Sequence, residues 1–171
     1  MATRCNIFLR YGNSRIWLYR HWDGYPASVG PDIHAAVRAA TKESFHAGQD
    51  VLERLMALRD EDGRAQYRLT SGQHGDIDWL YGIDLNPHTM TPPRLLCAAV
   101  RHPVWPDGDE DPIGQADAGN GWVNLDAFVR RVNTEILALN NRVKAHNARN
   151  GTSAEEFPLI WAGTEQNSVE A

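Results

Sequence analysis

The residues best suited to chemistry in this 171-residue chain form one short run, His-Trp-Asp-Gly-Tyr-Pro at 21–26. In an extended backbone, His21 and Asp23 point to the same side. A carboxylate beside an imidazole orients the ring and raises its pKa, which is what a general base needs. The same run also predicts a corner, because Asp23-Gly24 is a turn signal and a residue before proline, here Tyr25, favours an extended backbone. Both interpretations stay open, and the structural one is preferred.

A β-hairpin is predicted immediately before this run. Two strand-like stretches, 4–11 and 14–22, flank Gly12-Asn13, a pair that suits a two-residue primed turn. This turn sets Ile7 opposite Leu18, and alternation then divides the side chains between two faces. The face predicted to be core carries Cys5, Ile7, Leu9, Ile16, Leu18 and Trp22. The other carries Arg4, Asn6, Phe8, Arg10, Arg15, Trp17, Tyr19 and His21.

The second of these faces is the candidate binding surface. Arg10 is expected directly opposite Arg15, and such a pair repels unless something neutralises it. One interpretation is a packing face with its arginines in solvent. The other is a platform for a nucleotide, a single strand or an acidic partner, which would stack on the rings and pair with the guanidinium groups. The predicted binding residues are Arg10, Arg15, Trp17, Tyr19, His21 and Tyr25.

Other chemistries find less support. The stretch His74-Gly75-Asp76-Ile77-Asp78 contains metal-ligand side chains, but no His-Glu-x-x-His or Cys-x-x-Cys pattern accompanies it. We interpret it as a polar loop and predict no metal site. The chain contains no P-loop, no Gly-x-Gly-x-x-Gly and no Gly-x-Ser-x-Gly, which argues against kinases, NTPases and α/β-hydrolases. No cofactor is predicted.

The remaining periodicities predict an α+β fold. Helices are expected at 31–45, where Pro31 would take the first helical position, at 50–59 behind a capping box opened by Asp50, and at 124–147. Further strands are expected at 66–70, 77–85 and 95–101, and an edge strand at 157–161. Together these give an antiparallel sheet of about four or five strands, the N-terminal β-hairpin plus central strands, packed with about three helices.

The helix predicted at 124–147 carries a heptad seam. Its apolar residues are spaced by four and three, at Leu125, Val129, Val132, Ile136, Leu139 and Val143. The preferred interpretation is a helix lying across the sheet. The alternative is a homodimer through helix 124–147.

Length and composition favour one domain, residues 1–162, with a flexible tail at 163–171. The net charge is −5, so non-specific binding of nucleic acid by the whole surface is not expected. Both cysteines lie among strand-like residues and are expected to be buried free thiols. The chain has no apolar run of membrane-spanning length and begins without the apolar stretch of a signal peptide, so we expect a cytoplasmic protein.

The N-terminal part of the chain resembles a family of small uncharacterised proteins of bacteria and their phages. The resemblance lies in Thr3-Arg4 and Ile7, in the run from Tyr19 to Pro26, and in Gly30. The stretch 76–84, with Trp79 and Tyr81, is similar to the family's second aromatic strand. The phage distribution implies an accessory role such as counter-defence.

These observations predict a non-catalytic binding protein of phage type. Its expected partner is a nucleotide or a host macromolecule, for example a basic nucleic-acid-binding protein met by the acidic loop 107–111. No membrane partner is expected. The rival hypothesis is a small hydrolase or nuclease with His21 as general base and Asp23 orienting it.

Overall fold

The computed structural model describes residues 3–40, 47–85, 92–100, 112–113 and 121–160. The chain divides into two compact units, residues 1–125 and 126–171. The expected acidic loop 107–111 and tail 163–171 lie outside the described residues. Among the described residues, no helix is both long enough and apolar enough to cross a membrane.

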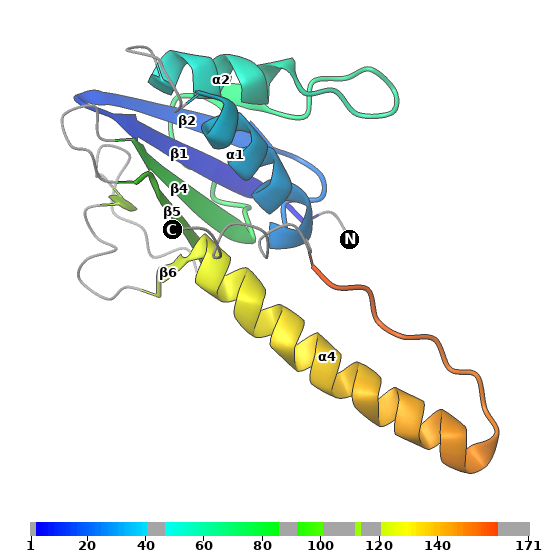
Figure 1. The fold of residues 1–171 in the computed structure, drawn as a ribbon. Helices are drawn as coiled ribbons and strands as arrows, with labels where there is room; N and C mark the ends of the chain where they lie inside the picture. Colours follow the sequence, from blue (N-terminus) through cyan, green and yellow to red (C-terminus); the bar gives the residue numbers. More distant parts are fainter. Residues whose placement is uncertain (1–2, 41–46, 86–91, 101–111, 114–120, 161–171) are drawn as a thin grey trace. The chain divides into compact units, whose positions relative to one another are not determined.

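The first unit is built on a six-stranded sheet with the order β3-β2-β1-β4-β5-β6 (Figure 1). Neighbouring strands are antiparallel except for β1 and β4, which are parallel. The strands are β1 (Cys5–Tyr11), β2 (Ser14–Arg20), β3 (Arg68–Thr70), β4 (Trp79–Leu85), β5 (Arg94–Ala99) and β6 (Val123–Asn124). The fold is therefore α+β, as predicted, but the sheet is mixed rather than antiparallel and has six strands rather than the predicted four or five.

The predicted hairpin register is confirmed. Ile7 lies opposite Leu18, Tyr11 opposite Ser14, and Gly12 has a φ of 56°, a value suited to a primed turn. The parallel pairing of β1 with β4 was not predicted, because the two strands are distant in the sequence and no local pattern links them. Strand β2 already ends beside the start of β1, with Arg20 opposite Cys5, and the chain between β2 and β4, which includes two helices and β3, comes back to that same end, where Trp79 lies opposite Cys5.

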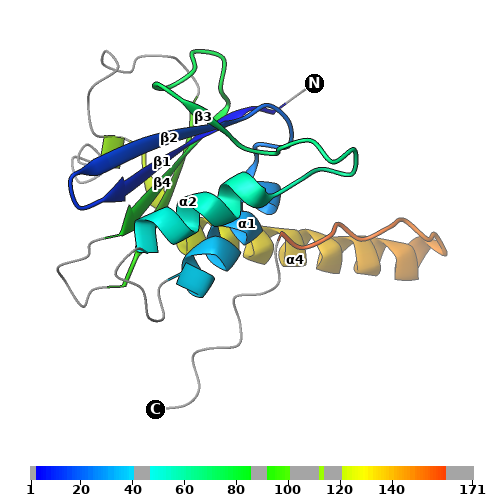
Figure 2. The ribbon, with the colours of Figure 1, turned by 90° about the horizontal axis from the view of Figure 1, so that it is seen from above.

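Helices α1 (Pro26–Ala40) and α2 (Ala47–Ala57) lie against one face of this sheet (Figures 1 and 2). Helix α1 begins at Pro26, so the prediction that Pro31 starts it is wrong, and residues 41–45 of the predicted helix lie outside the described part. Pro26 takes the N-terminal position where a missing N–H costs nothing. Pro31 lies inside the helix, where it cannot donate to the carbonyl four residues back; Gly30, which has no Cβ, removes the separate clash between the proline ring and the preceding residue.

The start of α2 also differs from the prediction. Asp50 lies within its first turn rather than capping it. A Cβ at Gly48 would stand 2.5 Å from the Tyr11 ring, so the helix and β1 approach closely at this point. Val51 and Leu55 supply the fully buried positions of the helix.

The opposite face of the sheet holds a small apolar cluster. Phe8, Leu96 and Ile113 are buried in it, with Trp17 and Trp122 packed against them. Gly82 makes room for this cluster, because a Cβ there would lie 3.1 Å from the Ile113 side chain. Both faces of the sheet are thus partly covered, which accounts for the burial of β1 on its two sides.

The second unit consists of α4 (Leu125–Asn150), from Asp126 on, and the residues after it. Helix α4 starts directly after Asn124, as predicted. Residues 152–160, called the return segment below, turn back at Gly151, which has a φ of 61° (Figure 1). The described part of the predicted edge strand, residues 157–160, is not in a strand.

Candidate functional site

The run 21–25 forms the corner between β2 and α1. Asp23 has a φ of 52°, so the chain turns sharply there. Gly24 donates its N–H to the Thr3 carbonyl at 2.8 Å, and a Cβ at this position would lie only 2.7 Å from the backbone of Arg4. Tyr81 donates its hydroxyl to the Gly24 carbonyl at 2.9 Å. The corner is therefore packed against the start of β1, and glycine at position 24 is required for that approach.

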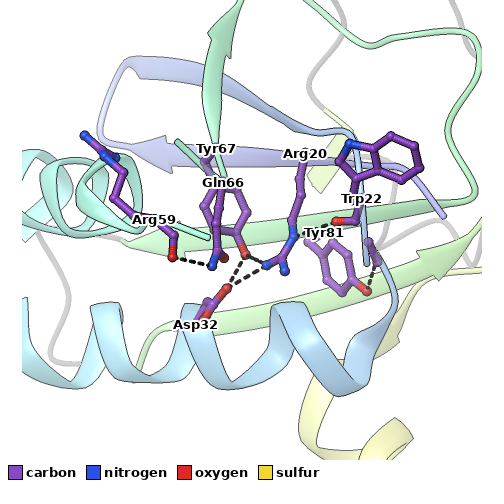
Figure 3. A network of polar contacts seen from close by, with 8 residues as sticks. Arg20, Trp22, Asp32, Arg59, Gln66, Tyr67 and Tyr81 are labelled. Carbon is purple, nitrogen blue, oxygen red and sulfur yellow. Dashed lines mark hydrogen bonds and ion pairs between the residues drawn. The ribbon is translucent and has the colours of Figure 1, made fainter. Parts of the chain in front are cut away.

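The inner side of the corner contains a network around Arg20 (Figure 3). Its Nη1 donates to Oδ2 of Asp32 and to the hydroxyl of Tyr67, each at 2.8 Å, and its Nε donates to the Trp22 carbonyl. The Tyr67 hydroxyl completes the triangle by donating to Asp32 at 2.7 Å. Burial, followed by the Asp32 charge, raises the pKa of Tyr67 above its ordinary value. The network ties β2 to α1 and to the residue before β3.

The outer side of the corner carries exposed aromatic and ionisable groups. Trp22 is 62% exposed, so its predicted place in the core is wrong. Strand β2 ends at Arg20, and alternation cannot be extended past that residue. The His21 ring meets the Trp22 indole edge-on, with centroids 4.6 Å apart. The indole is thus held by a neighbour while most of its surface remains open to solvent.

His21 and Asp23 have different hydrogen-bond partners. Nδ1 of His21 lies 3.0 Å from the Tyr19 hydroxyl, and Asp23 accepts a hydrogen bond from the Tyr25 hydroxyl at 3.2 Å. The Asp23 charge and this hydrogen bond raise the pKa of Tyr25. The prediction of a common side assumed an extended backbone, and the positive φ of Asp23 removes that assumption.

The other residues of the candidate binding surface mostly make contacts within the protein. Arg10 does lie opposite Arg15, but its other neighbour, Asp84 on β4, takes a two-pronged ion pair with it at 2.6 and 3.0 Å. The Trp17 ring packs on Phe8 with centroids 4.8 Å apart. Of the predicted binding residues at this end of the hairpin, Arg15 alone is exposed. The packing interpretation therefore describes this end well.

The residues considered for a metal are also engaged. The ring of His74 stacks on Tyr19 with centroids 4.0 Å apart, and its Nε2 lies 3.1 Å from the Thr70 hydroxyl. Asp76 pairs with the Arg4 guanidinium at 2.6 Å. Asp78 accepts the backbone N–H of Arg4 at 3.0 Å. These side chains fix the loop before β4 to the start of β1 and to β3.

An open pocket of about 620 Å³ lies at the corner, lined by exposed residues of the outer side and also by Arg20. Residues 19–23 line it on one side, and residues 59–62, 64–66 and Arg68 complete the lining. The second wall is a small hydrogen-bonded turn in which Asp60 N–H donates to the Arg64 carbonyl at 2.9 Å. The volume of the pocket is within the range of ordinary small-molecule sites. The sequence pattern gave no sign that residues 59–68 belong to this site.

The arginines that line the pocket differ in whether a carboxylate pairs with them. Arg20 is paired with Asp32, and Arg64 with Asp62 at 3.0 Å. Arg59 donates to the carbonyls of Met56 and Leu58, which are neutral. Among the described residues, no carboxylate pairs with Arg59 or with the exposed Arg68, which lies opposite Tyr19 in the sheet. Both arginines line the pocket.

Comparison of the chain with protein-family models, with curated proteins and with solved structures gives no match.

Proposed function

We propose that this is a non-catalytic binding protein whose pocket at the corner takes a nucleotide. The observation that carries the proposal is the exposed Trp22 indole beside a pocket that Arg59 and Arg68 also line. A nucleobase gains stacking energy on such an indole, and a phosphate gains charge-assisted hydrogen bonds from guanidinium groups. A volume of about 620 Å³ is enough for one nucleotide.

The proposed binding site lies at the corner after β2 and not along the whole hairpin face. The surface predicted from the sequence extends from Arg10 to Tyr25, but Arg10 and Trp17 make contacts within the protein. The rival hydrolase or nuclease needs His21 beside Asp23. Since His21 is bonded to Tyr19 and Asp23 to Tyr25, nothing in the geometry favours that rival, and it is not proposed.

Titration calorimetry with adenosine monophosphate and with inorganic phosphate tests the proposal. We expect the nucleotide to bind more tightly than phosphate, because only the nucleotide can stack on Trp22. Trp22→Ala and Arg68→Ala should each weaken nucleotide binding by about tenfold or more. Phosphate binding should respond to Arg68→Ala and not to Trp22→Ala.

Arg15→Ala is the matched control, since Arg15, like Arg68, is an exposed arginine on a strand but lies outside the pocket. It should bind the nucleotide as the unchanged protein does. If Arg15→Ala weakens binding as much as Arg68→Ala does, the ligand lies along the face and the pocket proposal is wrong. Absence of nucleotide binding to the unchanged protein would also refute it.

A further inference from the structure

Three asparagines recur at intervals of seven residues on α4: Asn133, Asn140 and Asn147. Seven residues make nearly two helical turns, so the three side chains lie along one face. Asn140 is the most enclosed of them, with 6% of its surface exposed. We call these residues the asparagine ladder.

Each rung of the ladder binds both backbone groups of one residue in the return segment. The amide Nδ2 donates to the carbonyl, and Oδ1 accepts the N–H of the same residue. The pairs, with the two distances, are Asn133 with Ile160 (2.6 and 2.7 Å), Asn140 with Phe157 (2.9 and 2.8 Å) and Asn147 with Ala154 (2.9 and 3.1 Å).

The spacing of the ladder matches an extended chain. The bound residues are three apart, and three extended residues span about 10 Å. Seven helical residues rise about 10.5 Å. Because each rung binds N–H and C=O groups that every non-proline residue has, the ladder recognises an extended peptide backbone. Pro158 falls between the rungs, where its missing N–H is not needed.

Few apolar contacts help to hold the return segment in place. Phe157 is 51% exposed and Leu159 is 40% exposed. The ion pair between Lys144 and Glu156, at 3.2 Å, joins two largely exposed side chains. A segment held mainly by hydrogen bonds near solvent can open locally at low cost. The ladder would then be free for another extended chain.

We propose that the asparagine ladder is a peptide-binding site which accepts the return segment of a second copy of this chain. The chemistry of this occupant is the one whose fit the structure displays, and every copy carries both ladder and ligand. Exchange requires opening at the Gly151 turn and recreates the same contacts between two chains. Leu137 and Leu139, which are 51% and 41% exposed on α4, give two such helices apolar surface to cover.

The first measurement uses a fluorescent peptide with the sequence of residues 152–160, added to the full-length chain. Phe157→Pro in the chain removes the N–H that Asn140 accepts and should loosen the chain's own segment. We expect this variant to bind the peptide about tenfold more tightly than the unchanged chain, because the intramolecular competitor is weakened. Adding Asn140→Ala should reduce that binding by about tenfold or more, since one rung loses both hydrogen bonds.

Asn141→Ala is the matched control, because Asn141 is exposed and has no rung. It should leave peptide binding unchanged. Asn140→Asp, which keeps the acceptor but replaces the Nδ2–H donor with a carboxylate oxygen that repels the Phe157 carbonyl, should also weaken peptide binding and covers the case in which alanine disturbs the helix. Circular dichroism checks helicity. Equal losses with Asn140→Ala and Asn141→Ala, or no peptide binding by the Phe157→Pro chain, would overturn the proposal.

The second measurement is the molar mass of the full-length chain by light scattering over a range of concentrations. A dimer fraction that rises with concentration and falls with Asn140→Ala supports exchange between copies. A chain that binds the peptide through Asn140 yet stays monomeric throughout would overturn the assignment to a second copy. The ladder's occupant would then be an extended segment of another protein. Because the ladder lies in α4, this result is independent of nucleotide binding.

Discussion

On the inner side of the corner, Arg20 shares hydrogen bonds with Asp32 and Tyr67, and its side chain is 11% exposed. On the outer side, Arg68 is exposed and pairs with no carboxylate among the described residues, and Trp22 is 62% exposed. Two arginines on neighbouring strands thus differ in whether a carboxylate of the described residues pairs with them. The difference teaches that residue type alone does not assign a role. What decides the role is whether a neighbouring element supplies a partner.

The comparison predicts that the inner side carries the stability of the corner. Asp32→Asn removes the charge opposite Arg20 and leaves a largely buried guanidinium without a counter-ion. We expect a loss of about 2–4 kcal/mol in the free energy of unfolding, at the low end if water reaches the partly exposed carboxylate. Urea denaturation measures it.

Asp62→Asn breaks an ion pair of the outer side, in which Arg64 and Asp62 are both largely exposed. It serves as the control and should change the free energy of unfolding by less than about 0.5 kcal/mol. Similar losses from the two variants would remove the distinction between the two sides.

Trp22 shows the point at which the alternation of strand side chains no longer predicts burial, because β2 ends at Arg20. The primed turn and the alternation of the hairpin are local, so the register of β1 and β2 was predictable residue by residue. Applied beyond Arg20, the same alternation placed Trp22 in the core and assigned no role to Arg20. The end of β2 depends on Asp32 and Tyr67, which are distant in the sequence, and no local pattern reveals them.

The same reasoning explains two other outcomes. Pro31 resembled a helix start, but Pro26 offers the same chemistry five residues earlier, and the sequence does not choose between them. The asparagine ladder had a visible signal, an Asn every seven residues. That signal is weak by itself because polar residues are common on exposed helix faces. The role of the three asparagines becomes clear only from the hydrogen bonds that they make with the return segment.

A second prediction concerns alkaline pH and again separates buried from exposed groups. Burial raises the pKa of Cys5 from an ordinary value of 9.0 to about 12. The folded state therefore binds a proton that the unfolded state releases. The resulting stability is fully present below about pH 9 and is lost as pH rises toward about 12. By about pH 10.5 we expect this thiol to cost about 2 kcal/mol.

The measurement is the free energy of unfolding against pH for the unchanged chain and for Cys5→Ala. The variant is less stable at neutral pH because it leaves a cavity, so the slope rather than the absolute value is compared. Tyr67 and Tyr81, whose pKa values are also raised by burial, add to the slope in both proteins. Identical slopes would mean that Cys5 is not protonated and buried in the folded state.

The smallest predicted effects come from a matched pair of phenols, one on each side of the corner. Each donates its hydroxyl to an aspartate: Tyr67 to Asp32 at 2.7 Å, and Tyr25 to Asp23 at 3.2 Å. Tyr67 is fully buried, whereas Tyr25 is 41% exposed. Tyr67→Phe should therefore cost about 1 kcal/mol, because the largely buried Arg20 loses an acceptor at the same time as Asp32 loses a donor. Tyr25→Phe should stay within about 0.5 kcal/mol of the unchanged chain, because water can bond Asp23 instead. Chemical denaturation measures both losses of unfolding free energy. Equal losses would mean that the Asp23–Tyr25 hydrogen bond stabilises the corner as much as the Tyr67–Asp32 hydrogen bond does. The proposed difference between a stabilising inner side and a ligand-binding outer side would then be wrong.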